Sequence, residues 1–318
     1  MQYFDQETLN ALMDWPGLVE ALRGAFSTEP SSPVRAQLDI PTSLGDDITL
    51  LTMPAYQAGH RFGIKCATVA PGNARRNLPS VHAVYVLFDG ITGQPLATFD
   101  ADRLTAWRTA AASALASQLL SRPDASHLLI LGTGRVARAL IDAHASVRPI
   151  ETVSVWGRTP EAAERLSMEF HDPSFQVHPI KSREAAVEEA DIISCATMSR
   201  EPLFDGSRVL PGTHIDLVGA FRPDMRESDD QLMQRAEIFV DTRDGCLAEA
   251  GDLIASLKSG ALTKRDIRGD LTELCRRVMV GRHSPTDITL FKSVGTAIED
   301  LAAADWFFER HAHAQEET

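Results

Sequence analysis

The spacing of hydrophobic residues along this chain of 318 residues changes near residue 121. Before that point, apolar runs alternate with turn residues, which is typical of short strands. They predict an opening helix that ends near Ala25, followed by strands at 34–40, 48–53, 62–69, 81–88 and 96–99. The connections are too short to hold crossover helices, so we expect antiparallel pairing. The first part is therefore predicted to be an α+β unit.

An alanine-rich segment at 102–121 follows the last of these strands. Alanine has the highest intrinsic helix propensity. We therefore expect a helix here, leading into a second domain.

From His127 onward, short apolar runs alternate with segments of helical periodicity. The runs lie at 127–131, 152–156, 191–196, 214–218 and 237–240, and helices are expected at 135–146 and 160–170. Helices of this length are the crossovers that a parallel sheet requires. The second part is therefore predicted to be an α/β domain of the Rossmann type, with a doubly wound parallel sheet.

A last helix is expected to open at 291–295, to continue through 304–308 and to return to the first domain. The predicted domains are therefore 1–121 with 295–318, and 122–294.

The first parallel strand runs directly into a G-x-G-x-x-A sequence, Gly132, Thr133, Gly134, Arg135, Val136 and Ala137. In such a loop the first glycine permits a tight turn and the second lets backbone N–H groups approach a pyrophosphate, while a small third residue allows close helix packing. The motif alone is weak and could be a plain structural turn. Because it follows an apolar strand and opens a helix, it predicts a dinucleotide site.

The residues after the second parallel strand, Gly157-Arg158-Thr159, bear on the choice of nucleotide. A domain that selects NAD usually carries Asp or Glu here, which this chain lacks. Arg158 can instead pair with a 2′-phosphate, and Thr159 can donate a hydrogen bond while capping the next helix. NADPH is the expected cofactor. NADH is the alternative, with Arg158 then a solvated loop cation.

Composition narrows the class of protein. A formal net charge of −13 disfavours nucleic acid, whose affinity for proteins comes mainly from Lys and Arg clusters. The four cysteines are far apart and form no C-x-x-C pair, so we expect no metal site, no disulfide framework and a reducing cytoplasm. No apolar run approaches the length of a bilayer span, and we expect no membrane partner.

Several segments together resemble the ornithine cyclodeaminase and mu-crystallin family. They are Gly63-Ile64-Lys65 running to Pro71-Gly72-Asn73, then 78–83 and 108–114, continued by the loop at 132–137 and by 291–295. The resemblance covers nearly the whole chain in the correct order, which is more specific than any single motif. It implies a homodimer in which a Rossmann domain faces a dimer-forming substrate domain across the active site.

In the family, a strand arginine, a strand lysine and a helix arginine hold the substrate carboxylate, and the matching residues here are Arg35, Lys65 and Arg108. An arginine fork gives direction to the bonds with a planar carboxylate, and a lysine adds a point charge that could also donate a proton. Burying Lys65 and Arg108 without an anion would be costly.

Three further residues are candidates by the same resemblance. His82 could donate a proton or bond to the substrate or the nicotinamide, although a histidine satisfied in the core would look the same in sequence. Ser293 and Val294 resemble residues at the nicotinamide end, although they could simply cap and pack the returning helix.

At two positions the chain departs from true ornithine cyclodeaminases. Leu51 and Phe221 stand where those enzymes carry acidic residues, so the second ammonium of ornithine would lack a counter-charge. Apolar side chains opposite the basic residues that hold the carboxylate would suit a cyclic ketimine instead. The Phe221-Arg222-Pro223 segment resembles the branch of ketimine reductases that includes Δ1-pyrroline-2-carboxylate reductase.

The resemblance therefore implies an NAD(P)H-dependent oxidoreductase. Its expected reaction is the reduction of Δ1-pyrroline-2-carboxylate or Δ1-piperideine-2-carboxylate to L-proline or L-pipecolate. An alanine or opine-type amino-acid dehydrogenase, an ornithine cyclodeaminase and a non-catalytic NADP-binding crystallin remain alternatives. Asp216 is expected to be structural, and the ring size, the proton donor and the physiological direction stay open.

Overall fold

The computed structural model describes residues 1–28, 31–33, 35–43, 46–76 and 78–316. The chain divides into two compact units, which we call unit 1 (Met1–Arg108 with Thr296–Thr318) and unit 2 (Thr109–Gly295). The first division lies inside the alanine-rich helix α3 (Ala101–Leu120).

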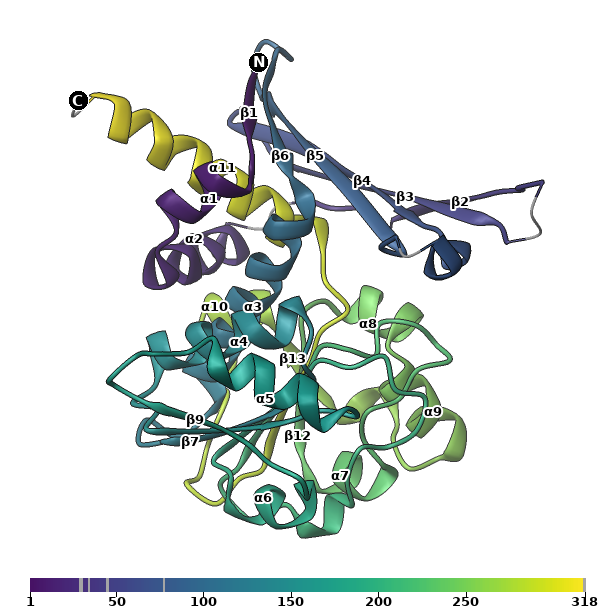
Figure 1. The fold of residues 1–318 in the computed structure, drawn as a ribbon, viewed down its shortest axis with the longest axis vertical. Coiled ribbons are helices and arrows are strands. Elements are labelled where there is room, and N and C mark those ends of the chain that lie inside the picture. Colours follow the sequence, from purple (N-terminus) through teal and green to yellow (C-terminus); the bar gives the residue numbers. More distant parts are fainter. Residues whose placement is uncertain (29–30, 34, 44–45, 77, 317–318) are drawn as a thin grey trace. The chain divides into compact units, whose positions relative to one another are not determined.

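Unit 1 is built on a six-stranded sheet in the order β1-β6-β5-β4-β3-β2 (Figure 1). Strands β2 to β6 pair antiparallel, as the short connections predicted, whereas β1 pairs parallel to β6. Helix α11 packs against β3, β4 and β5 and also contacts α2. The strands are β1 (Gln2–Phe4), β2 (Ala36–Ile40), β3 (Ile48–Gln57), β4 (Arg61–Val69), β5 (Val81–Asp89) and β6 (Pro95–Asp100), and the helices are α1 (Gln6–Leu12), α2 (Trp15–Ser27), the short η1 (Pro71–Arg76) and α11 (Ala297–Glu316).

The opening segment of unit 1 differs from the prediction of one helix. Two helices form, because the backbone is extended at Met13 and Asp14 and Pro16 opens the second helix. The three-residue β1 before them was not predicted, because a strand of this length has too few residues to show a period. Residue 34, where the first strand was predicted to begin, lies outside the described residues.

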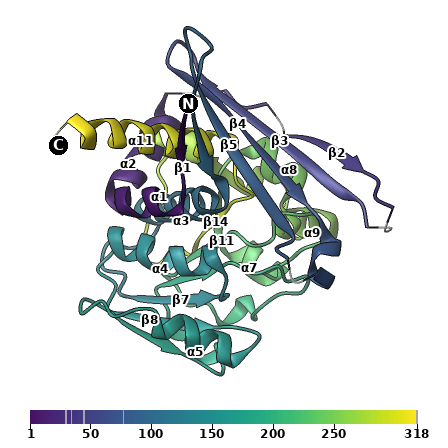
Figure 2. The same ribbon diagram turned by 45° about the horizontal axis from the view of Figure 1, so that its top comes forward.

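Unit 2 contains an eight-stranded parallel sheet in the order β13-β12-β14-β11-β10-β7-β8-β9 (Figure 2). The strand order reverses between β7 and β10, as in a doubly wound Rossmann sheet, so the predicted fold class is confirmed. The strands are β7 (His127–Leu131), β8 (Thr152–Trp156), β9 (Gln176–Pro179), β10 (Ile192–Cys195), β11 (His214–Leu217), β12 (Glu237–Val240), β13 (Ile267–Asp270) and β14 (Thr289–Lys292).

The connections of unit 2 are mostly helical. They are α4 (Arg135–Val147), α5 (Pro160–Met168), α6 (Arg183–Glu189), α7 (Asp230–Arg235), α8 (Arg243–Glu249), α9 (Gly251–Ser259) and α10 (Leu271–Cys275), with the short turns η2 (Gly206–Arg208) and η3 (Lys264–Asp266). A hydrophobic core of strand residues such as Leu129, Ile193 and Leu290 packs against residues of these helices.

The segment 291–295 corrects one prediction. It does not open a helix, because Thr289–Lys292 forms β14 between β11 and β12, and the helix begins only at Ala297. Leu290 and Phe291 are fully buried there. A short apolar run of this kind fits a buried strand or a buried helix equally well, and only its neighbours in the sheet decide.

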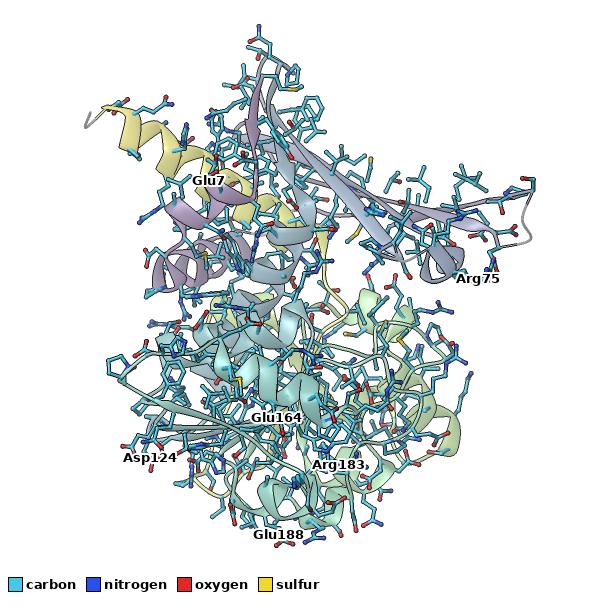
Figure 3. The ribbon with its side chains drawn as sticks, in the orientation of Figure 1. Glu7, Arg75, Asp124, Glu164, Arg183 and Glu188 are labelled. Carbon is cyan, nitrogen blue, oxygen red and sulfur yellow. The ribbon has the colours of Figure 1, made fainter. Side chains whose placement is uncertain are left out.

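Charged side chains lie on the outside of each unit, and some of them are labelled in Figure 3. Asp124, Glu164 and Glu188 are exposed on unit 2, and Arg75 is exposed on unit 1. Within the described part of the chain, no helix is both long enough and apolar enough to cross a membrane.

Candidate active site

The loop between β7 and α4 has the backbone geometry that a dinucleotide site needs. Gly132 has φ 139°, and a Cβ there would lie 2.6 Å from the Ala196 carbonyl oxygen at the end of β10. Gly134 is exposed at the start of α4, and a Cβ there would meet no atom within 4 Å. Ala137 is fully buried beside Gly132. The first glycine therefore closes the turn, and the second leaves room for a phosphate.

The other residues of 132–137 complete the phosphate-binding loop. Thr133 fills the space beside Gly157, where a Cβ would lie 2.6 Å from the Thr133 Cγ2 atom. Arg135 and Val136 form the first turn of α4, the former exposed and the latter half-buried. Backbone N–H groups at such a helix start favour an anion. The residues present therefore fit a pyrophosphate.

Arg158 and Thr159 follow β8 on the surface of unit 2. Both are exposed, and Arg158 makes no ion pair with any residue that the structure describes. Thr159 is the N-cap residue of α5, but its side chain makes no capping hydrogen bond, contrary to the prediction. Its hydroxyl and the guanidinium are thus positioned on an exposed turn beside the phosphate loop.

Ser293 and Val294 lie in a buried turn at the end of β14. The Ser293 hydroxyl and the backbone N–H groups of Val294 and Gly295 all donate to Asp241 Oδ2, at 2.9, 2.8 and 2.8 Å. Gly295 has φ 79°, which favours glycine. Asp241, which was not predicted, therefore fixes the shape of this turn.

Lys65 and Arg108 are gathered in unit 1 by two acidic residues of α11. Lys65 Nζ lies 2.7 Å from Asp300 Oδ2 and 2.9 Å from Oδ1. Arg108 donates from Nε to Asp300 Oδ1 at 2.9 Å and from Nη1 to Glu299 Oε2 at 2.5 Å. All four residues are buried, with Lys65 and Arg108 4% and 5% exposed and the two carboxylates fully buried. Sequence reasoning identified both cations and missed both anions.

The charges of this cluster determine the protonation of Lys65 and Asp300. Burial lowers the pKa of Lys65 against the opposing effect of Asp300, and with the charges of Arg108 and Arg35 it brings that pKa to about 8. Burial would raise the pKa of Asp300, but Arg108 and Lys65 outweigh it and hold that pKa below its usual value. Lys65 is thus a cation at neutral pH that another anion would stabilise.

Arg35 lies near the same cluster. It is half-buried just before β2, and its Nη1 is 3.9 Å from the Met53 sulfur. Met53 pairs directly with Lys65 across β3 and β4. The structure therefore brings together the three basic residues that the resemblance assigned to a carboxylate.

His82 does not join them within unit 1. On β4 and β5, Lys65 pairs with Tyr85 and Thr68 pairs with His82, so Lys65 and His82 point to opposite faces of the sheet. His82 is exposed, whereas Tyr85 is fully buried. A role for His82 beside Lys65 thus gains no support from the fold of this unit.

The two positions where the chain departs from ornithine cyclodeaminases are also described. Leu51 is half-buried and pairs with Ala67, so it shares the sheet face of Lys65. Phe221 is 38% exposed and lies four residues after β11.

Asp216 is fully buried and accepts hydrogen bonds from Ser113 and Ser194 at 2.9 and 2.6 Å, consistent with a structural role.

Among the residues that the structure describes, no group of three or more His, Cys, Asp and Glu could hold a metal ion. All four cysteines are free thiols.

The sequence model of the ornithine cyclodeaminase/mu-crystallin family matches residues 6–315. The chain is 41% identical over 307 residues to the Δ1-pyrroline-2-carboxylate reductase of Paracoccus denitrificans, covering 96% of this chain and 95% of the relative. It is 37% identical over 296 residues to the ketimine reductase mu-crystallin of Mus musculus, covering 92% and 90%. A solved structure of Thermococcus litoralis Δ1-pyrroline-2-carboxylate reductase in complex with NADH and L-proline has a TM-score of 0.92 at 32% identity, over 99% of this chain and 98% of that one. This chain belongs to the ornithine cyclodeaminase/mu-crystallin family.

Proposed function

We propose that this protein uses a nicotinamide dinucleotide to reduce the C=N bond of a cyclic ketimine carboxylate. The substrates are Δ1-pyrroline-2-carboxylate and Δ1-piperideine-2-carboxylate, and the products are L-proline and L-pipecolate. The buried cluster of Lys65, Arg108, Glu299 and Asp300 is the observation that carries this proposal. The names of the relatives in Paracoccus denitrificans and Mus musculus support it.

The charges of the cluster favour a substrate with one carboxylate. Glu299 and Asp300 offset the charges of Lys65 and Arg108, so the buried pair of cations is stable before a substrate arrives. Arg35 then adds a third positive charge close enough to lower the pKa of Lys65. An incoming carboxylate would offset that charge and accept hydrogen bonds from groups whose orientation is already fixed.

Leu51 and Phe221 bear on which carboxylate is accepted. Neither side chain can offset the second ammonium of an ornithine or lysine substrate, and burying that charge unpaired would be costly. A ring imine has an apolar perimeter apart from its carboxylate and its nitrogen, so it tolerates an apolar wall.

The reaction adds a hydride to C2 of the imine and a proton to its nitrogen. When bound, the dinucleotide supplies a hydride to C2 of the imine. Lys65 and Arg108 bind the carboxylate and orient C2, while the phosphate loop of unit 2 holds the pyrophosphate. Lys65 retains its proton at neutral pH, since its pKa is about 8. It is therefore available to protonate the imine nitrogen, as is a water molecule.

We infer a preference for NADPH from the turn after β8. Arg158 is exposed beside Gly157 and Thr159, and no acidic residue stands there to bind the ribose hydroxyls. An exposed guanidinium without an ion-pair partner among the described residues suits a 2′-phosphate. NADH, which the Thermococcus litoralis structure contains, is the alternative.

We also propose a homodimer, as the family resemblance implied, and a cytoplasmic location, as the widely separated cysteines indicated. The sheet face of unit 1 opposite Lys65 exposes large apolar side chains, and a second copy of the chain would cover them. They are Leu38, Ile40, Tyr56 and Val84, which are 59%, 39%, 49% and 41% exposed. Sedimentation velocity of the wild type and of Leu38→Glu tests this, because a charge on the face should produce monomers.

A spectrophotometric screen tests the function. NADPH and NADH are each combined with the two ring imines, with pyruvate plus ammonia or methylamine, and with ornithine. We expect rapid oxidation of NADPH with a ring imine and little with the others. Turnover with pyruvate and an amine, but not with either ring imine, would instead indicate an amino-acid dehydrogenase of the alanine or opine type. No turnover combined with tight dinucleotide binding would indicate a binding protein.

A further inference from the structure

Two loops of unit 2 meet where the strand order of the parallel sheet reverses, between β7 and β10. One is the phosphate-binding loop at 132–137, and the other begins at Ala196. The Ala196 N–H donates to the Leu131 carbonyl oxygen at 2.9 Å, and a Cβ at Gly132 would lie 2.6 Å from the Ala196 carbonyl oxygen. Ligands of doubly wound sheets bind outside the carboxyl ends of the strands at such a reversal. The loop after β10 is therefore expected to form the second side of the dinucleotide site.

This loop has little regular structure to hold it. Residues 196–203, all of which the structure describes, form neither helix nor strand, and Met198 is 75% exposed. Their backbone is paired with a segment after β11 instead. The Arg226 N–H donates to the Ser199 carbonyl oxygen at 2.8 Å, and the Leu203 N–H donates to the Glu227 carbonyl oxygen at 2.9 Å. An irregular loop keeps one conformation only through contacts of this kind.

The Glu227 carboxylate adds the contact nearest to β10. Its Oε1 accepts from the Thr197 backbone N–H and from the Thr197 hydroxyl, both at 2.7 Å. Its Oε2 accepts from the backbone N–H groups of Gly219 and Ala220, at 2.9 and 3.2 Å. An ionised carboxylate is an acceptor only, so it can take all four bonds. Glu227 is fully buried and therefore ties the loop after β10 to the loop after β11 away from water.

Charged and ionisable groups from α9, β14 and β10 face Glu227. Asp252, in the first turn of α9, accepts at Oδ1 from the Glu227 and Ser228 N–H groups at 2.8 and 2.9 Å, and its Oδ2 lies 3.1 Å from Lys292 Nζ of β14. The Cys195 thiol of β10 stays neutral, because burial raises its pKa well above its usual value. Burial also raises the pKa of Glu227; the charge of Lys292 opposes that rise and the charge of Asp252 adds to it, which places the pKa at about 7.

We propose that Glu227 is a positioning residue for the nicotinamide dinucleotide. By fixing Thr197, its carboxylate keeps the loop after β10 against Gly132, and so it keeps the second side of the dinucleotide site in one conformation. The inference rests on the dinucleotide binding in the proposed function and adds a support that lies outside the phosphate-binding loop. A site that is held in one conformation before its ligand arrives loses less entropy on binding.

Glu227→Gln tests the proposal with little change in shape. An amide has one accepting oxygen, so either the Thr197 donors or the Gly219 and Ala220 donors would face an NH₂ group. In fluorescence titrations without substrate, we expect the dissociation constants of NADPH and NADH both to rise about tenfold. Hydrogen exchange at the Thr197 amide should become faster. Unchanged dissociation constants for both dinucleotides would overturn the proposal.

The pH profile of NADH binding separates positioning from general damage. NADH is the probe because it lacks the 2′-phosphate, and a phosphate monoester itself titrates near neutral pH. A protonated Glu227 must donate from one oxygen, so it cannot keep all four bonds. The affinity of the wild type should therefore fall about fivefold between pH 8 and pH 6, beyond any fall in Glu227→Gln. An equal fall in the two proteins would overturn the proposal.

Thr197→Val keeps the proposal testable if Glu227→Gln does not fold. It removes the hydroxyl donor, whereas the backbone N–H and the Glu227 carboxylate remain. The dissociation constants of both dinucleotides should rise about threefold, because a single hydrogen bond is lost. Constants equal to those of the wild type would overturn the proposal.

The matched control is Asp191→Asn, at the opposite end of the same two strands. Asp191 precedes β10 and accepts from the backbone N–H groups of Ser126 and His127, at 2.8 and 3.0 Å, where β7 begins. It should leave both dissociation constants unchanged, and a loss equal to that of Glu227→Gln would overturn the proposal. A wild type that binds neither dinucleotide, although its Thr197 amide exchanges slowly, would refute the proposed function. A wild type that binds them, with Glu227→Gln binding equally well, would refute only this inference.

Discussion

Asp300→Asn is the most direct test of the proposal that Arg35, Lys65 and Arg108 bind the substrate carboxylate. We call these three residues the carboxylate clamp. Asp300 is fully buried in unit 1, where it contacts Lys65 Nζ at 2.7 and 2.9 Å and accepts from Arg108 Nε at 2.9 Å. Asparagine has nearly the same shape but no charge. The variant therefore leaves two buried cations with Glu299 as their remaining anion from α11.

The cost to folding follows from that loss of charge. Removing one partner of a buried ion pair destabilises a protein by about 3–5 kcal/mol. For a chain of this size, that corresponds to a Tm lower by roughly 5–8 °C.

The cost to substrate binding follows from the pKa of Lys65. Asp300 raises that pKa against the effect of burial, and together they place it at about 8. Without Asp300 the pKa of Lys65 falls below about 8, so Lys65 carries less charge at pH 7 and its charge-assisted bond to the substrate carboxylate is weakened or lost. Such a bond is worth about 1.5–3 kcal/mol. KM for the imine should therefore rise about tenfold to a hundredfold.

The assay combines thermal unfolding, NADPH binding by fluorescence and steady-state kinetics at pH 7. Asp305→Asn is the matched control, because Asp305 lies on the same helix and pairs with His60 and Arg61 at 2.7 and 3.3 Å, outside the clamp. It should cost about 1 kcal/mol or less and leave KM unchanged. NADPH affinity should be the same in both variants. If Asp300→Asn kept the KM of the wild type, the clamp would not depend on this carboxylate and the reasoning would be wrong.

Three further changes have defined outcomes. Arg158→Ala should weaken NADPH binding about tenfold or more and leave NADH binding unchanged, as measured by titration; equal losses for both would remove the assignment to the 2′-phosphate. Gly132→Ala should abolish binding of both dinucleotides in the same titration, since its Cβ would lie 2.6 Å from the Ala196 carbonyl oxygen. Retained binding would contradict the proposal that the loop at 132–137 binds the pyrophosphate. Lys65 has a pKa of about 8, so kcat/KM for the anionic imine should fall as the pH rises above 8 and Lys65 loses its charge. The pH-rate profile of Lys65→Arg should lack this fall.

The elements that the sequence predicted are those with a strong local signal. The antiparallel strands of unit 1 and the parallel runs at 127–131 and 152–156 each span enough residues to show a period. Strands β9 and β13 were missed because neither contains an apolar run: β9 is Gln-Val-His-Pro and mostly exposed, and β13 is Ile-Arg-Gly-Asp. The prediction of a helix start at 291–295 is wrong because the burial of β14 depends on strands that are distant in sequence.

Candidate site residues divide in the same way. Gly132 and Gly134 carry a local backbone requirement that a motif expresses directly. Glu299 and Asp300 instead act on Lys65 and Arg108 about 190 to 235 positions away, and an acidic pair in the first turn of a helix is also what a solvated helix start would show. The one available signal was physical: two buried cations require anions.

The charges around two buried lysines, Lys65 and Lys292, bear on which of them suits a substrate anion. Lys292 has its pKa raised, because Asp252 and Glu227 together outweigh the effect of burial. Lys65 has its pKa lowered to about 8, because burial outweighs the effect of Asp300 and because the charges of Arg108 and Arg35 also lower it. An added anion would therefore stabilise the charge on Lys65, whereas the charge on Lys292 is already stabilised by two carboxylates, Asp252 and Glu227. The balance of charge around each lysine therefore supports the proposed contact of Lys65 with the substrate carboxylate and favours no such contact for Lys292, although both lysines are buried.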